Sequence, residues 1–221
     1  MPPNITSLGN SDPLSDRLRT FSQQLTSISL EDIVISSELF WPTNSDSVQF
    51  PHWPHLTSFE LVFQPITPSG NWLFDRDPMA EVNSGDESRD LSLYFGDDEI
   101  PAREDWKADY FRIKPIEHLM NDFYLAAGHA VAEMPRLKVM RLEAVSSGNH
   151  GLEYKATAST ANLELWDMPR YYCEELWDRP PFQFSKDVLK VWMDAARRNT
   201  GAELEAKFVS ETQIFLAKGW W

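Results

Sequence analysis

The side chains that could carry catalysis or bind a metal are few and scattered. The chain contains five histidines: His52, His55, His118, His129 and His150. His52 and His55 flank a Trp-Pro pair, and no third ligand stands nearby at the spacing that a zinc site needs. His118 and His129 fall on one predicted helix, about 16 Å apart along its axis, so they cannot share an ion. We therefore expect no metal site, and we expect hydrogen-bonding roles for the histidines.

Nucleophilic and acid–base catalysis also lack a sequence motif. The single cysteine, Cys173, is followed by two glutamates, whose charges favour the thiol over the reactive thiolate. Carboxylate pairs such as Asp75/Asp77 and Asp97/Asp98 would suit a glycosidase or a divalent cation, but most such pairs in an acidic chain are solvated. The sequence contains no glycine-rich phosphate loop, GxSxG elbow or HExxH helix. We therefore expect no catalytic residue and no cofactor.

Aromatic side chains are the best candidates for a binding role. The chain contains nine tryptophans, and 13% of its residues are aromatic. Tryptophan and tyrosine dominate the energetic hot spots of protein interfaces, because they bury a large apolar area and keep a polar group at one end. We predict that a partner binds the aromatic residues on loops next to strands, namely Trp72, Trp106, Tyr110, Tyr171 and Trp177.

Charge and composition narrow the class of partner. The net charge is −14, with 34 acidic and 20 basic residues, which argues against binding to nucleic acid or to an anionic membrane. A basic protein partner fits this charge. No apolar stretch is long enough for a transmembrane helix, and the N-terminus is polar. One cysteine fits a reducing compartment. We expect an intracellular protein of the cytoplasm or nucleus.

One apolar signature occurs three times, Leu-x-x-apolar-x-Leu. Its copies are LTSISL (Leu25, Ile28, Leu30), LTSFEL (Leu56, Phe59, Leu61) and LKVMRL (Leu137, Met140, Leu142). This spacing is typical of leucine-rich repeats, in which short strands stack and bury what one unit cannot bury alone. Pro54 and Pro135 precede two of the copies and favour the start of an extended segment there. The pattern predicts an α/β fold, an irregular leucine-rich-repeat-like stack of strand-loop-helix units in one elongated domain. A plain α+β domain is the alternative.

Local patterns predict further elements and the organisation of the chain. We expect helices over residues 17–24, 115–134 and 186–201, the last capped by Ser185 and stopped by Gly201. We expect strands over residues 25–35, 58–63, 91–95, 151–158, 161–168 and 202–211, with the fourth and fifth forming a hairpin. The chain is divided into a mobile leader (1–15), the repeat-like domain (16–213) with an acidic mobile loop (79–90), and an aromatic tail (214–221).

Three longer runs carry a family resemblance. The runs FPHWPHLTSFELVF...PSGNWLFDRDP, AAGHAVAEMPRLKVMRLEA and RPPFQFSKDVLKVWMDAARRNTGAELE resemble the C-terminal region of fungal F-box proteins with leucine-rich-repeat-like domains, over roughly residues 20 to 210. In that family the F-box docks on a ubiquitin-ligase adaptor and the repeats present a target. The resemblance implies a scaffold without catalytic residues. The stretch before Leu25 is too short for an F-box, so we do not expect this chain to recruit the ligase adaptor.

The leading functional hypothesis is therefore a non-enzymatic intracellular scaffold for protein–protein interaction, resembling the substrate-recognition region of F-box proteins. One alternative is an enzyme or small-molecule-binding protein with an aromatic-lined pocket polarised by His118 or His129. Another is a truncated copy of a larger F-box protein.

Overall fold

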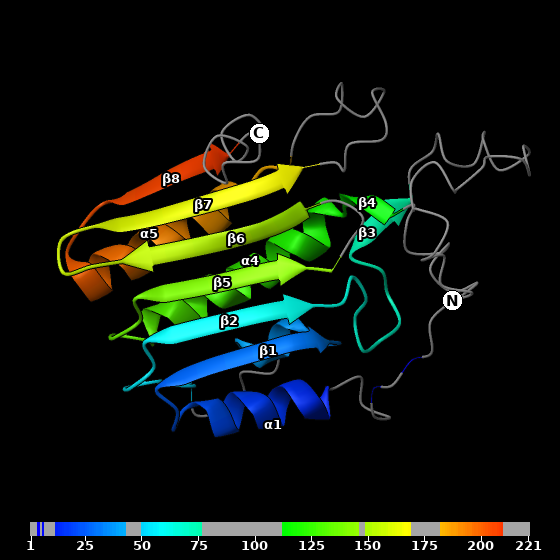
Figure 1. Ribbon diagram of the computed structural model, residues 1–221, viewed down its shortest axis with the longest axis horizontal. Coiled ribbons are helices and arrows are strands. Elements are labelled where there is room, and N and C mark those ends of the chain that lie inside the picture. Colours follow the sequence, from blue (N-terminus) through cyan, green and yellow to red (C-terminus); the bar gives the residue numbers. More distant parts are fainter. Residues whose placement is uncertain are drawn as a thin grey trace, which may run out of the picture.

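A six-stranded mixed sheet organises the computed structural model, which describes residues 4, 6, 12–42, 50–76, 112–145, 149–168 and 182–209 (Figure 1). In spatial order the strands are β1 (Ser27–Ile33), β2 (Ser58–Phe63), β5 (Val139–Ala144), β6 (Asn149–Ala156), β7 (Ala161–Met168) and β8 (Leu204–Val209). A separate antiparallel pair consists of β3 (Phe74–Arg76) and β4 (Arg112–Pro115). The chain is thus mixed α/β, which confirms the predicted class.

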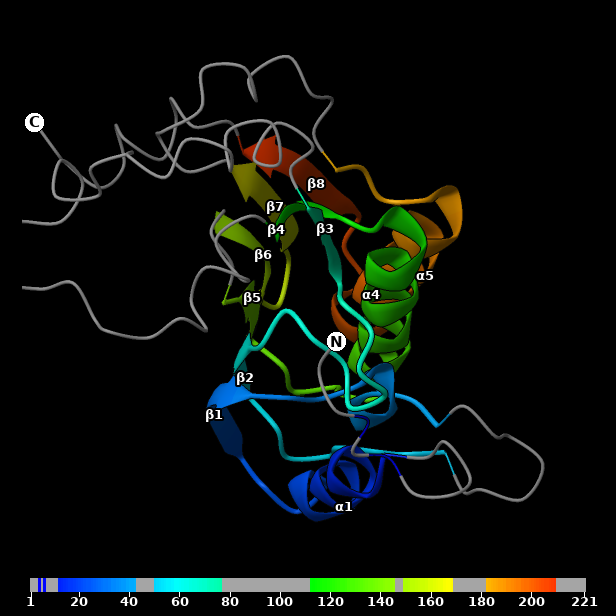
Figure 2. The ribbon, with the colours of Figure 1, turned by 90° about the vertical axis from the view of Figure 1, so that its right-hand side faces the viewer.

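The helices gather on one side of the six-stranded sheet. They are α1 (Pro13–Ser22), the short 3-10 helix η1 (Ser37–Leu39), α4 (Glu117–Ala132) and α5 (Lys186–Thr200). Figure 2 shows α1, α4 and α5 on the same side of the strands. The apolar sheet residues that point toward the helices form the core, while no helix in the described ranges covers the other side.

The three signature copies lie side by side. Their strands β1, β2 and β5 are parallel neighbours. The equivalent residues share rows across the sheet, one row of Ile28, Phe59 and Met140 and another of Leu30, Leu61 and Leu142. All except the half-buried Leu30 are buried. The spacing of the signature therefore identified three parallel strands and the face that each one buries.

Beyond β5 the sheet departs from a strand-and-helix repeat. Strand β6 runs antiparallel to both β5 and β7, while β7 and β8 are parallel. The link from β6 to β7 is a tight turn in which Thr157 N–H donates to the Thr160 carbonyl at 2.9 Å. A turn this short can only reverse the chain, because a parallel connection needs a crossover of a dozen or more residues. The predicted hairpin is confirmed, whereas a continuous repeat stack is not seen here.

Helix ends follow their capping residues. The Ser185 hydroxyl accepts from Val188 N–H at 3.3 Å, and Gly201 ends α5 with a φ of 72°. Both predicted caps are confirmed. Helix α1 begins inside the stretch expected to be a leader (1–15), because buried Asp12 caps it by accepting from Leu14 and Ser15 N–H. The predicted strand 91–95, loop 79–90 and tail 214–221 lie outside the described residues.

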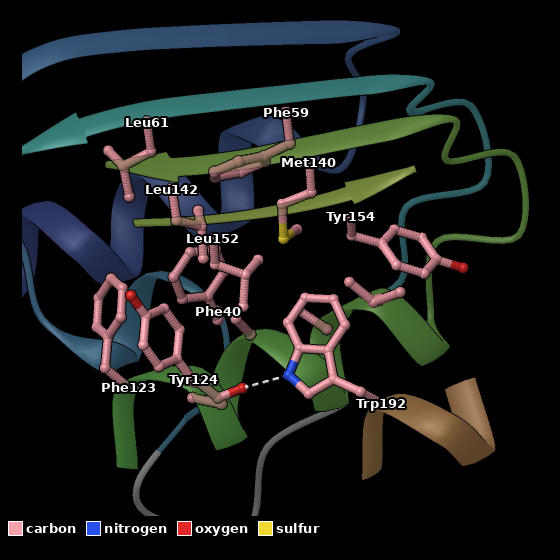
Figure 3. Packing of buried hydrophobic residues seen from close by; sticks show 14 of the residues in the cluster. Phe40, Phe59, Leu61, Phe123, Tyr124, Met140, Leu142, Leu152, Tyr154 and Trp192 are labelled. Atoms are coloured by element: carbon pink, nitrogen blue, oxygen red, sulfur yellow. Dashed lines mark hydrogen bonds between the residues drawn. The ribbon is translucent and has the colours of Figure 1, made fainter. Parts of the chain in front are cut away.

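Two buried tryptophans tie the helices to the rest of the core. Trp192 of α5 lies between α4 and the sheet, where its Nε1–H donates to the Tyr124 carbonyl at 2.9 Å (Figure 3). Trp53 donates to the Ser22 hydroxyl at the end of α1, at 2.7 Å. Each indole thus buries a large apolar area with its N–H satisfied, as a buried tryptophan requires.

Candidate interaction face

None of the described helices covers the side of the sheet away from α1, α4 and α5, and we call this side the open face. Since successive strand residues point to opposite sides, it carries every second residue. Its three rows follow from the strand register: Ser27, Ser58, Val139, Lys155, Asn162 and Glu205; Ser29, Glu60, Arg141, Glu153, Glu164 and Lys207; and Val62, Glu143, Gly151, Trp166 and Val209. Figure 1 views the sheet from this side.

Acidic residues outnumber basic ones on the open face, with five glutamates against one arginine and two lysines. Each basic side chain pairs with a glutamate of its own strand: Arg141 with Glu143 at 2.7 Å, Lys155 with Glu153 at 2.5 Å, and Lys207 with Glu205 at 3.1 Å. Within the described ranges, no ion pair neutralises Glu60 or Glu164. The open face therefore keeps a negative surplus.

Two of these carboxylates face each other. Glu153 on β6 lies directly opposite Glu164 on β7 in the antiparallel register. Like charges placed opposite each other across two strands destabilise a sheet. The ion pair of Lys155 with Glu153 and the position of Lys207 opposite Glu164 reduce this repulsion. An added cation beside Glu164 would reduce it further.

Trp166 stands in the next row, beside these carboxylates. Its half-buried indole covers Gly151 of the neighbouring strand, so closely that a Cβ on Gly151 would lie 2.5 Å from Trp166 Cζ2. The Arg141 guanidinium lies 5.9 Å from the ring centroid. Tryptophan and arginine are the residue types most enriched in interface hot spots. The open face thus combines an aromatic side chain with neighbouring acidic ones.

Of the sequence-predicted binding residues, the structure describes only Trp72, which is not part of the open face. Trp72 is half-buried near the β3–β4 pair, where the Arg112 guanidinium stacks 4.0 Å from its ring centroid. The other four, Trp106, Tyr110, Tyr171 and Trp177, are outside the described residues. Trp166 was not among the predicted binding residues, although the alternation of apolar and other residues in the segment ANLELWDM indicates its position. Leu163 and Leu165 point to the buried side of that strand, so Trp166 points to the opposite side.

The two helix histidines do not form a catalytic arrangement. His118 is exposed on α4, and His129 is half-buried with its ring 5.2 Å from that of Trp41. Burial lowers the pKa of His129, so its neutral form is favoured there. Among the described residues, no three histidine, cysteine or carboxylate side chains are grouped so that they could hold a metal ion.

His150 is the histidine that meets a carboxylate, and the sequence patterns did not single it out. On β6 its Nε2 lies 2.9 Å from the Tyr124 hydroxyl, and its Nδ1 lies 3.3 Å from Asp167 Oδ1 on β7. Asp167 Oδ2 also accepts from Phe182 N–H at 2.9 Å. His150 is only 1% exposed. Burial, and secondarily the Asp167 charge, raise the pKa of Tyr124 well above its ordinary value. This cluster joins α4 to two strands inside the core.

Two buried tyrosines offer a matched test of that cluster. The buried Tyr154 hydroxyl has no hydrogen-bond partner among the described residues, and burial raises its pKa to about 12. Replacing Tyr124 with phenylalanine leaves His150 Nε2 unpaired and should lower the free energy of unfolding by about 1–2 kcal/mol. Replacing Tyr154 with phenylalanine should leave that free energy unchanged or slightly higher. Urea unfolding followed by circular dichroism measures both, and equal losses would show that the Tyr124–His150 bond contributes nothing.

A cavity of about 230 Å³ lies between the N-cap of α1, η1, the loop 67–71 and α4. Its lining includes the carboxylates of Asp12, Glu38 and Asp122. Among the described residues of that lining, Phe123 is the single aromatic one and none is a histidine. This cavity therefore differs from the aromatic-lined pocket with a histidine that the enzyme hypothesis expects.

Comparisons of the chain with protein-family models, with curated proteins and with solved structures gave no significant match. None of the described helices is both long enough and apolar enough to cross a bilayer.

Proposed function

We propose that this protein is a non-enzymatic scaffold for protein–protein interaction, an irregular leucine-rich-repeat-like stack whose open face binds a basic segment of a partner. The observation that carries the proposal is the negative surplus around Trp166, with Glu153 and Glu164 directly opposite each other. The three parallel signature strands, with all described helices on their other side, support the repeat-like interpretation.

The spacing of the two unneutralised glutamates indicates what the open face would bind. Glu60 and Glu164 share one row and are three strands apart, or about 14 Å. In an extended peptide, residues four apart are separated by about 13 Å. A segment that crosses the strands can therefore place two lysines or arginines, four positions apart, on Glu60 and Glu164. The stem or guanidinium plane of a basic residue can then lie against the Trp166 indole.

The family resemblance supports the same role. In F-box proteins the repeat region presents a target, and we propose that the open face holds such a target here. A reducing compartment, the cytoplasm or nucleus, belongs to this proposal because the chain has one cysteine. Recruitment of the ligase adaptor is not part of it.

Affinity purification with matched variants tests the proposal. The tagged chain and the variants Trp166→Ser and Glu164→Lys are purified from the native cell type, and co-purifying proteins are quantified by mass spectrometry. We expect a near-stoichiometric partner with the wild type, reduced at least about tenfold in both variants because a hot-spot ring or a required charge is lost.

The control is Asp194→Lys, which makes the same charge change at an exposed position of α5 on the helix side. It should retain the partner. Equal loss of the partner from Glu164→Lys and Asp194→Lys, or no loss from either open-face variant, would contradict the proposed site.

A further inference from the structure

Strand β8 leaves one edge of the sheet open. It pairs with β7 on one side, and no strand in the described part of the chain pairs with its other side. Phe208 on β8 is 50% exposed, although it lies in the row of buried Leu165 and its ring is 6.1 Å from that of Phe184. Ala206 is also exposed on this helix-facing side. Within the described ranges this edge thus offers backbone groups that pair with no other strand, together with an apolar strip, the features that attract another strand.

The sequence of β8 complements itself. When two copies of Leu204–Val209 pair antiparallel with Ala206 at the centre, Glu205 faces Lys207 of the partner subunit and Lys207 faces Glu205 of the partner subunit. Leu204 and Phe208 face each other in the same way on the helix side. Opposite charges and apolar residues in directly opposed positions stabilise an antiparallel pair.

We propose that the protein forms a symmetric dimer through antiparallel pairing of β8 with β8 of a second copy. Each strand keeps its face in such a pair, so the two six-stranded sheets become one continuous sheet with all helices on one side. Formation of the dimer exchanges the Lys207–Glu205 ion pair within each strand for pairs between the strands. Loss of the existing pair costs little, because both side chains are more than half exposed and such a pair contributes little stability. Both open faces then lie on the same side of the dimer.

Charge reversal at the two facing positions gives a specific test. Sedimentation velocity over a protein concentration series measures the dimer dissociation constant of the full-length chain. Glu205→Lys places lysine opposite lysine, and Lys207→Glu places glutamate opposite glutamate. Each single variant should raise the dissociation constant at least about tenfold, because two attractive pairs become repulsive.

Two combinations should restore association. The double variant Glu205→Lys/Lys207→Glu exchanges the charges and should dimerise like the wild type. An equal mixture of the two single variants should form heterodimers, since a chain with two lysines then meets a chain with two glutamates. The heterodimer also shows that both single variants are folded. Lys155→Glu, which makes the same charge change on β6, should leave the dimer intact.

Three results would overturn the proposal: a wild type that remains monomeric throughout the concentration series, a dimer that both single variants leave unchanged, or a mixture of the single variants that stays monomeric. Binding of the basic partner does not enter this measurement, so the dimer and the proposed function can fail separately.

Discussion

Replacing Trp192 with alanine is expected to lower the free energy of unfolding by about 3–5 kcal/mol. The indole is fully buried, packs 5.5 Å from the Tyr154 ring and donates a hydrogen bond to α4 (Figure 3). Gly128 lets α4 approach it closely, because a Cβ there would lie 2.9 Å from Trp192 Nε1. A loss of this size is a large part of the stability of a typical domain.

Urea unfolding followed by far-ultraviolet circular dichroism measures this loss. Trp192→Phe should lower the free energy of unfolding less than Trp192→Ala does, because phenylalanine keeps an aromatic ring and loses mainly the hydrogen bond. The matched control is Met193→Ala, one position along α5, where the side chain is 39% exposed. It should change stability by about 0.5 kcal/mol or less. If Trp192→Ala differed from the wild type by no more than this control, α5 would not be held by its tryptophan.

Replacing Gly151 with valine is expected to cost about 2–3 kcal/mol, the second largest effect. An added Cβ would lie 2.6 Å from the Leu142 carbonyl oxygen and 2.5 Å from Trp166 Cζ2. The carbonyl belongs to the backbone of β5, so the two strands must separate to admit the side chain. The Trp166 indole must also leave its position over β6, which changes the surface of the open face around it.

A double-mutant cycle separates these two contacts. Adding Trp166→Ala to Gly151→Val removes the clash with the ring and leaves the clash with the backbone. The combined loss should therefore be about 1 kcal/mol smaller than the sum of the two single losses. Lys155→Val is the control, because it puts valine at an exposed position on the same face of β6 and should not destabilise comparably. Strict additivity of the two losses would show that the Trp166 ring does not rest on Gly151.

The local patterns predicted much of the fold because each had a local cause. The last two apolar residues of each signature copy lie on the helix-facing side of their strand, and the serine and glycine caps of α5 act on their own helix. The hairpin followed from two alternating segments separated by a turn. In contrast, the repeat pattern by itself gives no information that the parallel arrangement ends at β5, next to which β6 runs antiparallel.

The candidate site was less predictable, because it depends on the register between strands. His150 and Asp167 meet only because their strands pair with those residues opposite each other, and the alternation within each strand does not by itself fix that register. The same holds for Trp166 over Gly151. Alternation alone would have placed Trp166 on the exposed face of its strand. The preference for aromatic residues on loops directed attention to Trp72, which stacks on Arg112 away from the open face.

Site-specific photo-crosslinking in the native cell type tests the location of the partner most directly. A photoreactive amino acid is placed at Glu164 on the open face and, in a second chain, at Asp194 on the helix side. We predict a covalent adduct with a basic protein from position 164 and none from position 194. An adduct formed only from position 194, or from neither position while the partner still co-purifies, would contradict binding at the open face.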